Sequence, residues 1–281
     1  MPNHQMLPNP IGCRSLTDPE ASRLQSQDAH LWLTPKTTCL TCTKESHGGV
    51  ATFRTREYGE IVTYDCSCME QWKLHRWLLN AGVDKRYQRF SWDDATHVNG
   101  DAQSAVMRYV VNAPSQISRG DGLTLWSEGR GTGKTLLASL LLKGLMADGH
   151  DGYFTQFNEM LENYTAGWRN QDERAWFTRR VRNAGVLVVD DMGRENKGRA
   201  NITESMFDTV IRARVAACKP TIITTNYTPD QLFQGYGSNV MSLLNEVNSY
   251  VEVSGIDYRP VVREQRVQDG LDGIVYPIVV K

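Results

Sequence analysis

The chain has 281 residues, which suits one large domain or a medium domain with a smaller companion. Apolar residues make up 40% of it, and 31 basic against 32 acidic side chains leave a net charge of -1. This balance argues against a protein that binds nucleic acid through its total charge, but it allows a local basic surface. No stretch reaches the roughly 18 apolar residues that a membrane span needs.

Composition divides the chain into three parts. Residues 1–36 are rich in Pro, Asn, Ser and Gln and lack the apolar core of a signal peptide, so we expect a flexible tail in a cytoplasmic protein. Residues 37–90 are expected to form a small module and a linker. They hold four cysteines, strand-like stretches and a helical pattern from Met69 to Asn80. Residues 91–281 are expected to form one larger domain, whose chemistry the motifs described below indicate.

Two close cysteine pairs, Cys39-Leu40-Thr41-Cys42 and Cys66-Ser67-Cys68, are separated by 23 residues. In a chain without an export signal, paired cysteines favour a metal over a disulfide, and four thiolates suit a closed tetrahedral Zn²⁺ site. His47 or His75 is an alternative to one cysteine, because Cys-x-Cys is a tight spacing. Reduced cysteines without metal are the other alternative. We therefore predict an N-terminal zinc-binding module.

From residue 91 onward, apolar runs alternate with helical patterns. Strands are predicted at 123–126, 153–156, 186–189 and 221–224, with a further strand-like run at 250–253. Helices are predicted at 102–112, 136–146, 204–217 and 239–247, and the region 159–182 is helical and basic. Continuous β-branched runs suit strands that are buried on both faces of a parallel sheet. The alternation predicts an α/β fold with right-handed crossovers and flanking helices.

The first predicted strand leads into a Gly-rich loop, Ser127–Thr135, and then into a helix. Glycines let the backbone approach phosphates, and the helix N-terminus directs N–H groups at the anion. Lys134 is predicted to reach the β- and γ-phosphates of ATP, and the Thr135 hydroxyl to bind Mg²⁺. The usual pattern has a glycine where this chain has Glu128. The predicted nucleotide contacts are Gly129, Arg130, Gly131, Thr132, Gly133, Lys134, Thr135 and Leu136.

Polar side chains follow two of the later predicted strands. Asp190 and Asp191 end the run that starts at Val186, and Asn226 follows the next strand. Asp190 is predicted to hold Mg²⁺ directly or through water, and Asp191 to orient or deprotonate the attacking water. Asn226 is placed to hydrogen-bond the γ-phosphate or that water. Each of these residues taken alone also fits an ordinary turn. Their combination with the phosphate loop favours a role in nucleotide binding and hydrolysis.

This ordered set of motifs resembles the AAA+ helicase loaders of bacteria and phages, the DnaC/DnaI type, and the related IstB-type transposition ATPases. The matching segments are Gly131–Thr135, Val188–Gly193, Pro220–Asn226 and Asp257–Arg259. The resemblance implies a P-loop AAA+ parallel sheet without a C-terminal helical lid. It also implies that Asn226 is a sensor on the strand beside the acidic one, and that Arg259 is a second sensor that reaches the nucleotide.

One position departs from the family's pattern. Such loaders usually carry an arginine that reaches the neighbouring subunit's ATP, and this chain has Leu243 there. A leucine cannot stabilise charge on a transferring phosphoryl group. Either Mg²⁺-dependent hydrolysis is weak, or a partner protein completes the site, or another arginine substitutes. Arg212 and Arg214 are candidates for the last case, although a solvated helix face also explains them.

Arginines and aromatic residues mix between Trp168 and Asn183. This mixture suits single-stranded DNA, by phosphate contact and base stacking. A subunit interface is an alternative for the arginines, and core packing is an alternative for Trp176 and Phe177. The predicted DNA contacts are Arg169, Arg179, Arg180 and Arg182.

The resemblance implies an ATPase that loads a replicative DNA helicase onto single-stranded DNA. The zinc module would grip the helicase, and ATP would order an oligomer of the chain. No membrane is expected among its partners. Two alternatives remain open: an IstB-type transposition ATPase that acts on duplex DNA, and an ATP-binding adaptor with little or no hydrolysis.

Overall fold

The computed structural model describes residues 52–65, 77–193 and 200–273. These residues fall into two compact units, of which the first ends at Asn80 and the second starts at Ala81. The predicted N-terminal tail, the cysteines of the predicted zinc module, most of the helix from Met69 and the last eight residues, 274–281, lie outside the described ranges. The zinc module therefore stays a prediction.

In the first unit, strands β1 (Thr52–Glu57) and β2 (Glu60–Asp65) form an antiparallel hairpin. Only Tyr58 and Gly59 make the turn, and both have a positive φ, of 50° and 92°. Two-residue hairpin turns of type I′ need such a φ at both positions. The strand character expected between the two cysteine pairs is confirmed.

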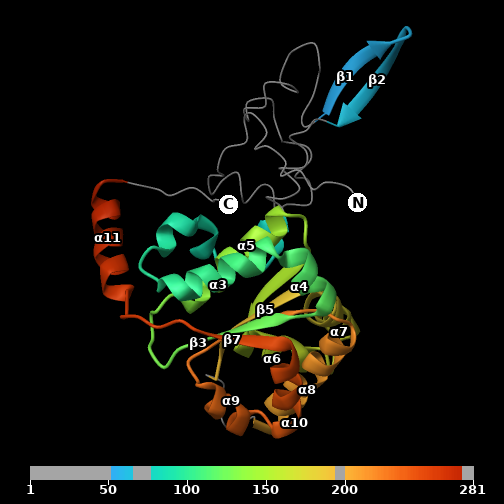
Figure 1. The fold of residues 1–281 in the computed structure, drawn as a ribbon. Helices are drawn as coiled ribbons and strands as arrows, with labels where there is room; N and C mark the ends of the chain where they lie inside the picture. Colours follow the sequence, from blue (N-terminus) through green and yellow to red (C-terminus); the bar gives the residue numbers. More distant parts are fainter. Residues whose placement is uncertain (1–51, 66–76, 194–199, 274–281) are drawn as a thin grey trace. The chain divides into compact units, whose positions relative to one another are not determined.

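The second unit is built on a five-stranded sheet in which all paired strands are parallel. The spatial order is β4-β5-β6-β3-β7, so β5, β6 and β3 lie in the middle (Figure 1). The strands are β3 (Gly122–Trp126), β4 (Gly152–Gln156), β5 (Val186–Met192), β6 (Thr221–Thr225) and β7 (Asn248–Glu252). Each lies within a few residues of its predicted place, and the α/β fold class is confirmed.

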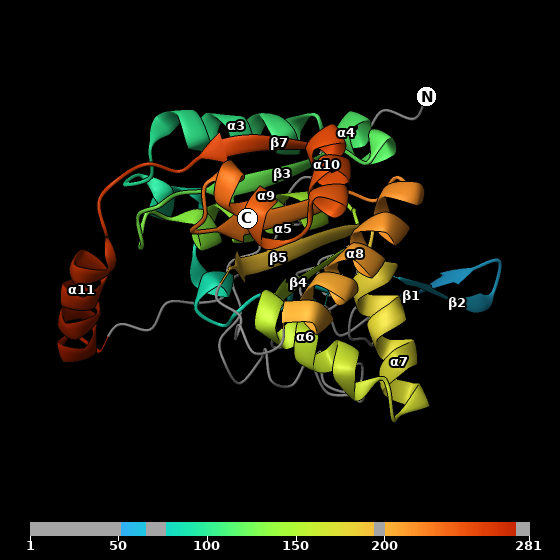
Figure 2. The same cartoon turned by 90° about the horizontal axis from the view of Figure 1, so that it is seen from below.

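Helices cover both faces of this sheet (Figures 1 and 2). On one face lie α3 (Gly100–Val111) and α5 (Lys134–Ala147), which pack against each other. On the other face lie α6 (Phe157–Ala166), α8 (Ala200–Ala216) and α10 (Ser238–Val247). Almost all of α5 is buried, including most of its leucines, because it is apolar around its whole circumference. This burial fixes the start of α5 against the carboxyl ends of the strands.

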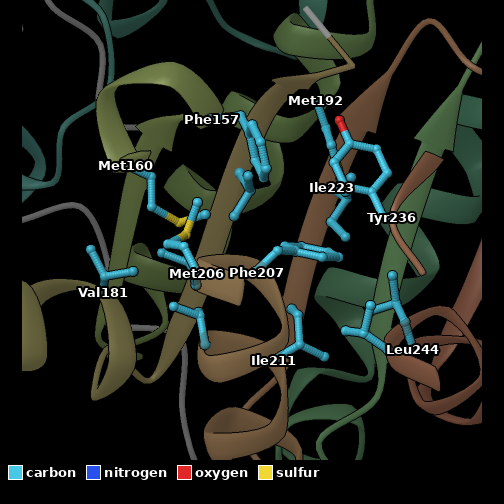
Figure 3. Close-up of a cluster of buried hydrophobic side chains, with 14 of the residues drawn as sticks. Phe157, Met160, Val181, Met192, Met206, Phe207, Ile211, Ile223, Tyr236 and Leu244 are labelled. Atoms are coloured by element: carbon cyan, nitrogen blue, oxygen red, sulfur yellow. The ribbon is translucent and has the colours of Figure 1, made fainter. Parts of the chain in front are cut away.

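Three aromatic rings dominate the core between the sheet and α6, α8 and α10. Phe157, Phe207 and Tyr236 are almost fully buried, and their ring centroids lie 5.5–5.8 Å apart in edge-to-face or tilted pairs. Such geometry is favourable for aromatic quadrupoles. Figure 3 shows these rings between β5, β6 and α8. They support the two strands that carry the predicted acidic residues and the asparagine.

Prolines begin three helices that the sequence analysis did not identify. Pro114 follows the predicted helix 102–112 and lies in the first turn of α4 (Ala113–Arg119). Prolines also lie in the first turns of α9 (Pro229–Gly235) and α11 (Arg259–Leu271). A first-turn N–H has no partner within its helix, so proline loses nothing there.

The region 159–182, predicted to be helical and basic, is divided into three pieces: α6, α7 (Gln171–Phe177) and a π-helical turn (Thr178–Arg182).

After β7, the described residues contain a single helix, α11, and not a helical bundle. Among the described residues, no helix is both long and apolar enough to cross a membrane.

Arg214 on α8 lies at the amino ends of β5 and β6, at the opposite edge of the sheet from the start of α5. Its side chain is 0% exposed. The guanidinium donates to the carbonyl oxygens of Val181 (3.0 Å), Ala184 (2.9 Å) and Pro220 (2.6 Å), and to the Thr221 hydroxyl (3.0 Å). Burial lowers the pKa of Arg214 to about 9. Both sequence interpretations of Arg214, as a substitute for the missing arginine and as a solvated residue, are therefore wrong.

We expect Arg214→Ala to destabilise the protein by at least about 3 kcal/mol, because it leaves several buried carbonyl groups without a donor. Arg212, on the same helix, is the matched control. It is exposed and pairs with Asp208 one turn away, so Arg212→Ala should change little. Urea titration of both variants measures the free energy of unfolding. Similar unfolding midpoints for the two variants would contradict this role of Arg214.

Candidate nucleotide-binding site

The loop between β3 and α5 has the backbone shape of a phosphate cradle. Gly131 and Gly133 have φ values of 70° and 100°, which favour glycine. A Cβ at Gly131 would also clash with the Asp257 carboxylate. Helix α5 begins immediately afterwards, at Lys134, so its first N–H groups face the loop. Turns of this kind at a helix N-terminus bind anions.

The ammonium group of Lys134 lies inside this loop. It donates to the Gly129 carbonyl at 2.8 Å, and lies 3.4 Å from both the Ser127 carbonyl and the Thr132 hydroxyl. Burial lowers the pKa of Lys134 to about 8, and the nearby Arg259 lowers it too, against the opposing effects of Asp191 and Asp190. Neutral oxygens compensate the charge of a partly buried ammonium group only in part, so a bound anion would stabilise it strongly. This environment therefore fits a phosphate.

Asp190 joins the loop to two neighbouring strands. One oxygen of its carboxylate accepts hydrogen bonds from the Thr135 hydroxyl (2.9 Å) and from the Thr224 hydroxyl (2.6 Å). Burial raises the pKa of Asp190, while these two hydrogen bonds lower it. A carboxylate beside a hydroxyl is a ligand set of the kind that Mg²⁺ prefers. The structure therefore brings together the two residues predicted to hold the metal.

Asp191 is held in an unusual backbone conformation beside this network. The pairing of β5 with β6 is irregular between Val189 and Met192, and Asp191 has a φ of 59°. Its N–H donates to the Thr224 hydroxyl (2.9 Å), and the Asn226 amide donates to its carboxylate (3.3 Å). A non-glycine residue with positive φ stores strain, which is frequent at functional sites. Asp191 and Asn226, predicted separately, are thus neighbours.

Thr224 is the residue of this network to which the sequence analysis assigned no role. Its hydroxyl donates to Asp190 and accepts from the Asp191 N–H, so it fixes both acidic residues. It lies on β6, which pairs with β5 in parallel. The sequence feature that could have identified Thr224 is its position: a hydroxyl residue near the carboxyl end of the strand that follows Asp190 and Asp191.

The start of α11 lies over the phosphate loop. The Tyr258 N–H donates to the Gly131 carbonyl at 3.2 Å, and the Tyr258 ring stacks on His97 with centroids 3.7 Å apart and planes 7° apart. Arg259 is exposed and close enough to Lys134 to lower its pKa. The structure therefore brings Arg259 near Lys134, and it adds a stacked ring pair that the sequence analysis did not find.

Leu243 and the predicted DNA contacts do not join this cluster. Leu243 is half-buried on α10 and packs against the core of Figure 3. Arg179, Arg180 and Arg182 lie in the turn before the amino end of β5, with Arg180 over the Tyr153 ring at 5.4 Å. Arg169 and Arg179 are exposed. Their contact with DNA stays a prediction.

Phe177 is buried and Trp176 packs edge-on against Tyr153, so core packing is confirmed as the role of these two aromatic residues.

Comparison with solved structures finds the same fold in replication proteins. The DnaC helicase loader is 27% identical, with a TM-score of 0.52, over 61% of this chain and 100% of that chain. DnaI is 18% identical, with a TM-score of 0.52, over 61% of this chain and 94% of that chain. The replication initiator DnaA bound to AMPPCP and single-stranded DNA is 14% identical, with a TM-score of 0.51, over 67% of this chain and 56% of that chain.

No protein-family model matches the chain, and neither does any curated protein sequence. The resemblance to loaders of the DnaC/DnaI type is nevertheless confirmed, by the structural similarity to the DnaC helicase loader. At their lower identities, DnaI and DnaA show the shared fold alone.

The affinity for ATP should fall about tenfold between pH 7 and pH 9. The pKa of Lys134 is lowered to about 8, so this side chain is charged below that pH and loses its proton, and its attraction for phosphate, above it. Titration with a fluorescent ATP analogue at several pH values measures the effect. Lys134→Arg is the control, because arginine stays charged throughout this range. Parallel pH profiles for the two proteins would show that Lys134 is not the titrating group.

Proposed function

We propose that this chain is an ATPase that loads a replicative DNA helicase onto single-stranded DNA. The observation that carries the proposal is the hydrogen-bonded network of Thr135, Asp190 and Thr224 next to Lys134. The similarity to the DnaC helicase loader, over the whole of that chain, supports the assignment of the partner. The similarity to DnaA, whose structure contains AMPPCP and single-stranded DNA, supports the two ligands.

The phosphate loop and α5 would bind ATP. The N–H groups from Gly129 to Leu136 would surround the phosphates, and Lys134 would supply a positive charge to the β- and γ-phosphates. Thr135 and Asp190 would hold Mg²⁺, which withdraws charge from the phosphate oxygens when it is bound. Arg259, at the start of α11, would contact the nucleotide from the other side of the loop.

Hydrolysis needs a water molecule placed opposite the leaving ADP. Asp191 would orient this water and accept its proton as the oxygen attacks the γ-phosphorus and the bond to the β-phosphate oxygen breaks. Asn226 donates to the Asp191 carboxylate, so it would fix the direction of that group. The strained backbone at Asp191 would keep the carboxylate in one position.

The remaining partners follow from the resemblance to loaders. The N-terminal module, with Zn²⁺ on Cys39, Cys42, Cys66 and Cys68, would hold the helicase. ATP would order several copies of the chain, and the exposed arginines Arg169 and Arg179 would contact single-stranded DNA.

One observation supports a second candidate, an adaptor that binds ATP with little hydrolysis. Leu243 packs against the core, so it supplies no charge to a neighbouring subunit's ATP. Turnover separates the two candidates. A loader that hydrolyses ATP should lose at least about 100-fold of its turnover in Asp191→Asn while it still binds ATP. An adaptor would show the same negligible turnover in both proteins.

The partner is tested by co-elution of the full chain with the replicative helicase of its host, with ATP and without it. We expect a stable complex that the variant Cys39→Ser/Cys42→Ser does not form, because zinc thiolates would hold the module together. The control variant is Cys218→Ser, since Cys218 is an exposed free cysteine of the ATPase unit. Absence of a complex under every nucleotide condition would reject the loader and favour the transposition ATPase, with duplex DNA as the next partner to test.

A further inference from the structure

Residues 83–91, here called the connector, lie near the start of the second unit and are fixed to α5. The connector forms a short 3-10 turn, Tyr87–Arg89, in which the buried Gln88 side chain donates to the Val83 carbonyl at 2.8 Å. The ammonium group of Lys143, on α5, donates to the carbonyl oxygens of Phe90 (2.5 Å) and Gln88 (3.3 Å). Lys143 is 2% exposed, and burial lowers its pKa to about 8. The turn is therefore attached to the helix that begins with Lys134 and Thr135.

This attachment brings Tyr87 to the metal end of the nucleotide site. Its hydroxyl is close enough to the Thr135 hydroxyl and to the Asp190 carboxylate for both groups to shift its pKa. Burial raises the pKa of Tyr87 and the charge of Asp190 raises it further, whereas Arg86 and Thr135 lower it. Tyr87 thus lies near both residues that would hold Mg²⁺.

Tyr87 in turn holds the guanidinium of Arg86. The Arg86 guanidinium donates to the Tyr87 hydroxyl at 2.6 Å, and its central carbon lies 4.6 Å from the centroid of the Tyr87 ring. Arg86 is exposed, and no carboxylate among the described residues forms an ion pair with it. Most of its five N–H donors therefore face no acceptor within the described part of the chain. A planar guanidinium held in this way is well suited to phosphate oxygens.

We propose that Arg86, positioned by Tyr87, contacts the terminal phosphate of ATP from within the same chain. The inference rests on the proposed function, because it assumes that ATP occupies the loop beside Lys134. Tyr87 is a common neighbour of Arg86 and of the residues that would hold Mg²⁺, so the guanidinium and the metal act on the same end of the nucleotide. Arg86 then supplies the positive charge that Leu243 lacks, and the connector responds to loss of the terminal phosphate.

The test compares the affinities of the full chain for ATP and ADP, measured by titration with fluorescent analogues in the presence of Mg²⁺. Arg86→Gln should weaken ATP binding about tenfold and leave ADP binding unchanged, because only ATP carries the phosphate that Arg86 contacts. Arg86→Lys should recover part of the loss, since it keeps the charge without the planar fork. The charge-matched control is Arg119→Gln. Arg119 pairs with Asp121 before β3, at the other edge of the sheet, so both affinities should stay unchanged.

Tyr87→Phe tests the positioning role, because it keeps the ring below the guanidinium and removes the hydroxyl that Arg86 contacts. It should lower the preference for ATP over ADP by less than Arg86→Gln does, and it should lower kcat more than it raises KM. Thermal unfolding without nucleotide verifies that each variant is folded, which we expect because the Arg86 side chain is exposed.

Two results would overturn the inference, and they differ in what else they overturn. An unchanged ratio of ATP to ADP affinity in Arg86→Gln would reject the role of Arg86 while the nucleotide site itself stands. Failure of the wild-type chain to bind either nucleotide would reject the proposed function and this inference together.

Discussion

The carboxylate of Asp190 is the contact on which the arrangement of the site depends. A single oxygen accepts hydroxyl hydrogen bonds from Thr135 at the start of α5 and from Thr224 on β6. Asp190 is 5% exposed, and burial of a charged carboxylate is costly unless donors of this kind offset it. The network therefore requires β5 and β6 to be adjacent and parallel, with α5 beginning beside their carboxyl ends, and the observed strand order meets this requirement.

The carboxyl and amino ends of the parallel strands, which form two opposite edges of the sheet, differ in composition and packing. At the carboxyl edge, polar groups are concentrated and the backbone is strained, at Asp191 and at the glycines of the phosphate loop. At the amino edge, Arg214 donates hydrogen bonds to backbone carbonyls at the ends of β5 and β6, away from the phosphate loop. Rigid packing at one edge permits the other edge to hold charged groups, which would bind an anion and a metal under the proposed function.

The sequence was informative where the signal is local. Short local patterns predicted three features: the glycine-rich loop up to Gly133, the β-branched strand from Val186 and the strand before Asn226. The hydrogen bond of Thr224 with Asp190 and the proximity of Tyr87 to Thr135 join residues 34 and 48 positions apart, and no local sequence pattern predicts such pairs. The role of Arg214 depends on its burial, which the sequence alone does not show. A charged residue in a predicted helix is expected to be solvated, because its hydrogen-bond acceptors are not known from the sequence.

The most direct test of the account measures how Mg²⁺ changes the affinity for ATP in the wild-type chain and in Thr224→Val. This substitution keeps the side-chain shape and removes the hydroxyl that fixes Asp190. We expect Mg²⁺ to strengthen ATP binding in the wild type, and we expect the variant to lose at least about tenfold of this gain while it binds metal-free ATP normally. An equal gain from Mg²⁺ in both proteins would contradict the claim that this network forms the metal side of a nucleotide site.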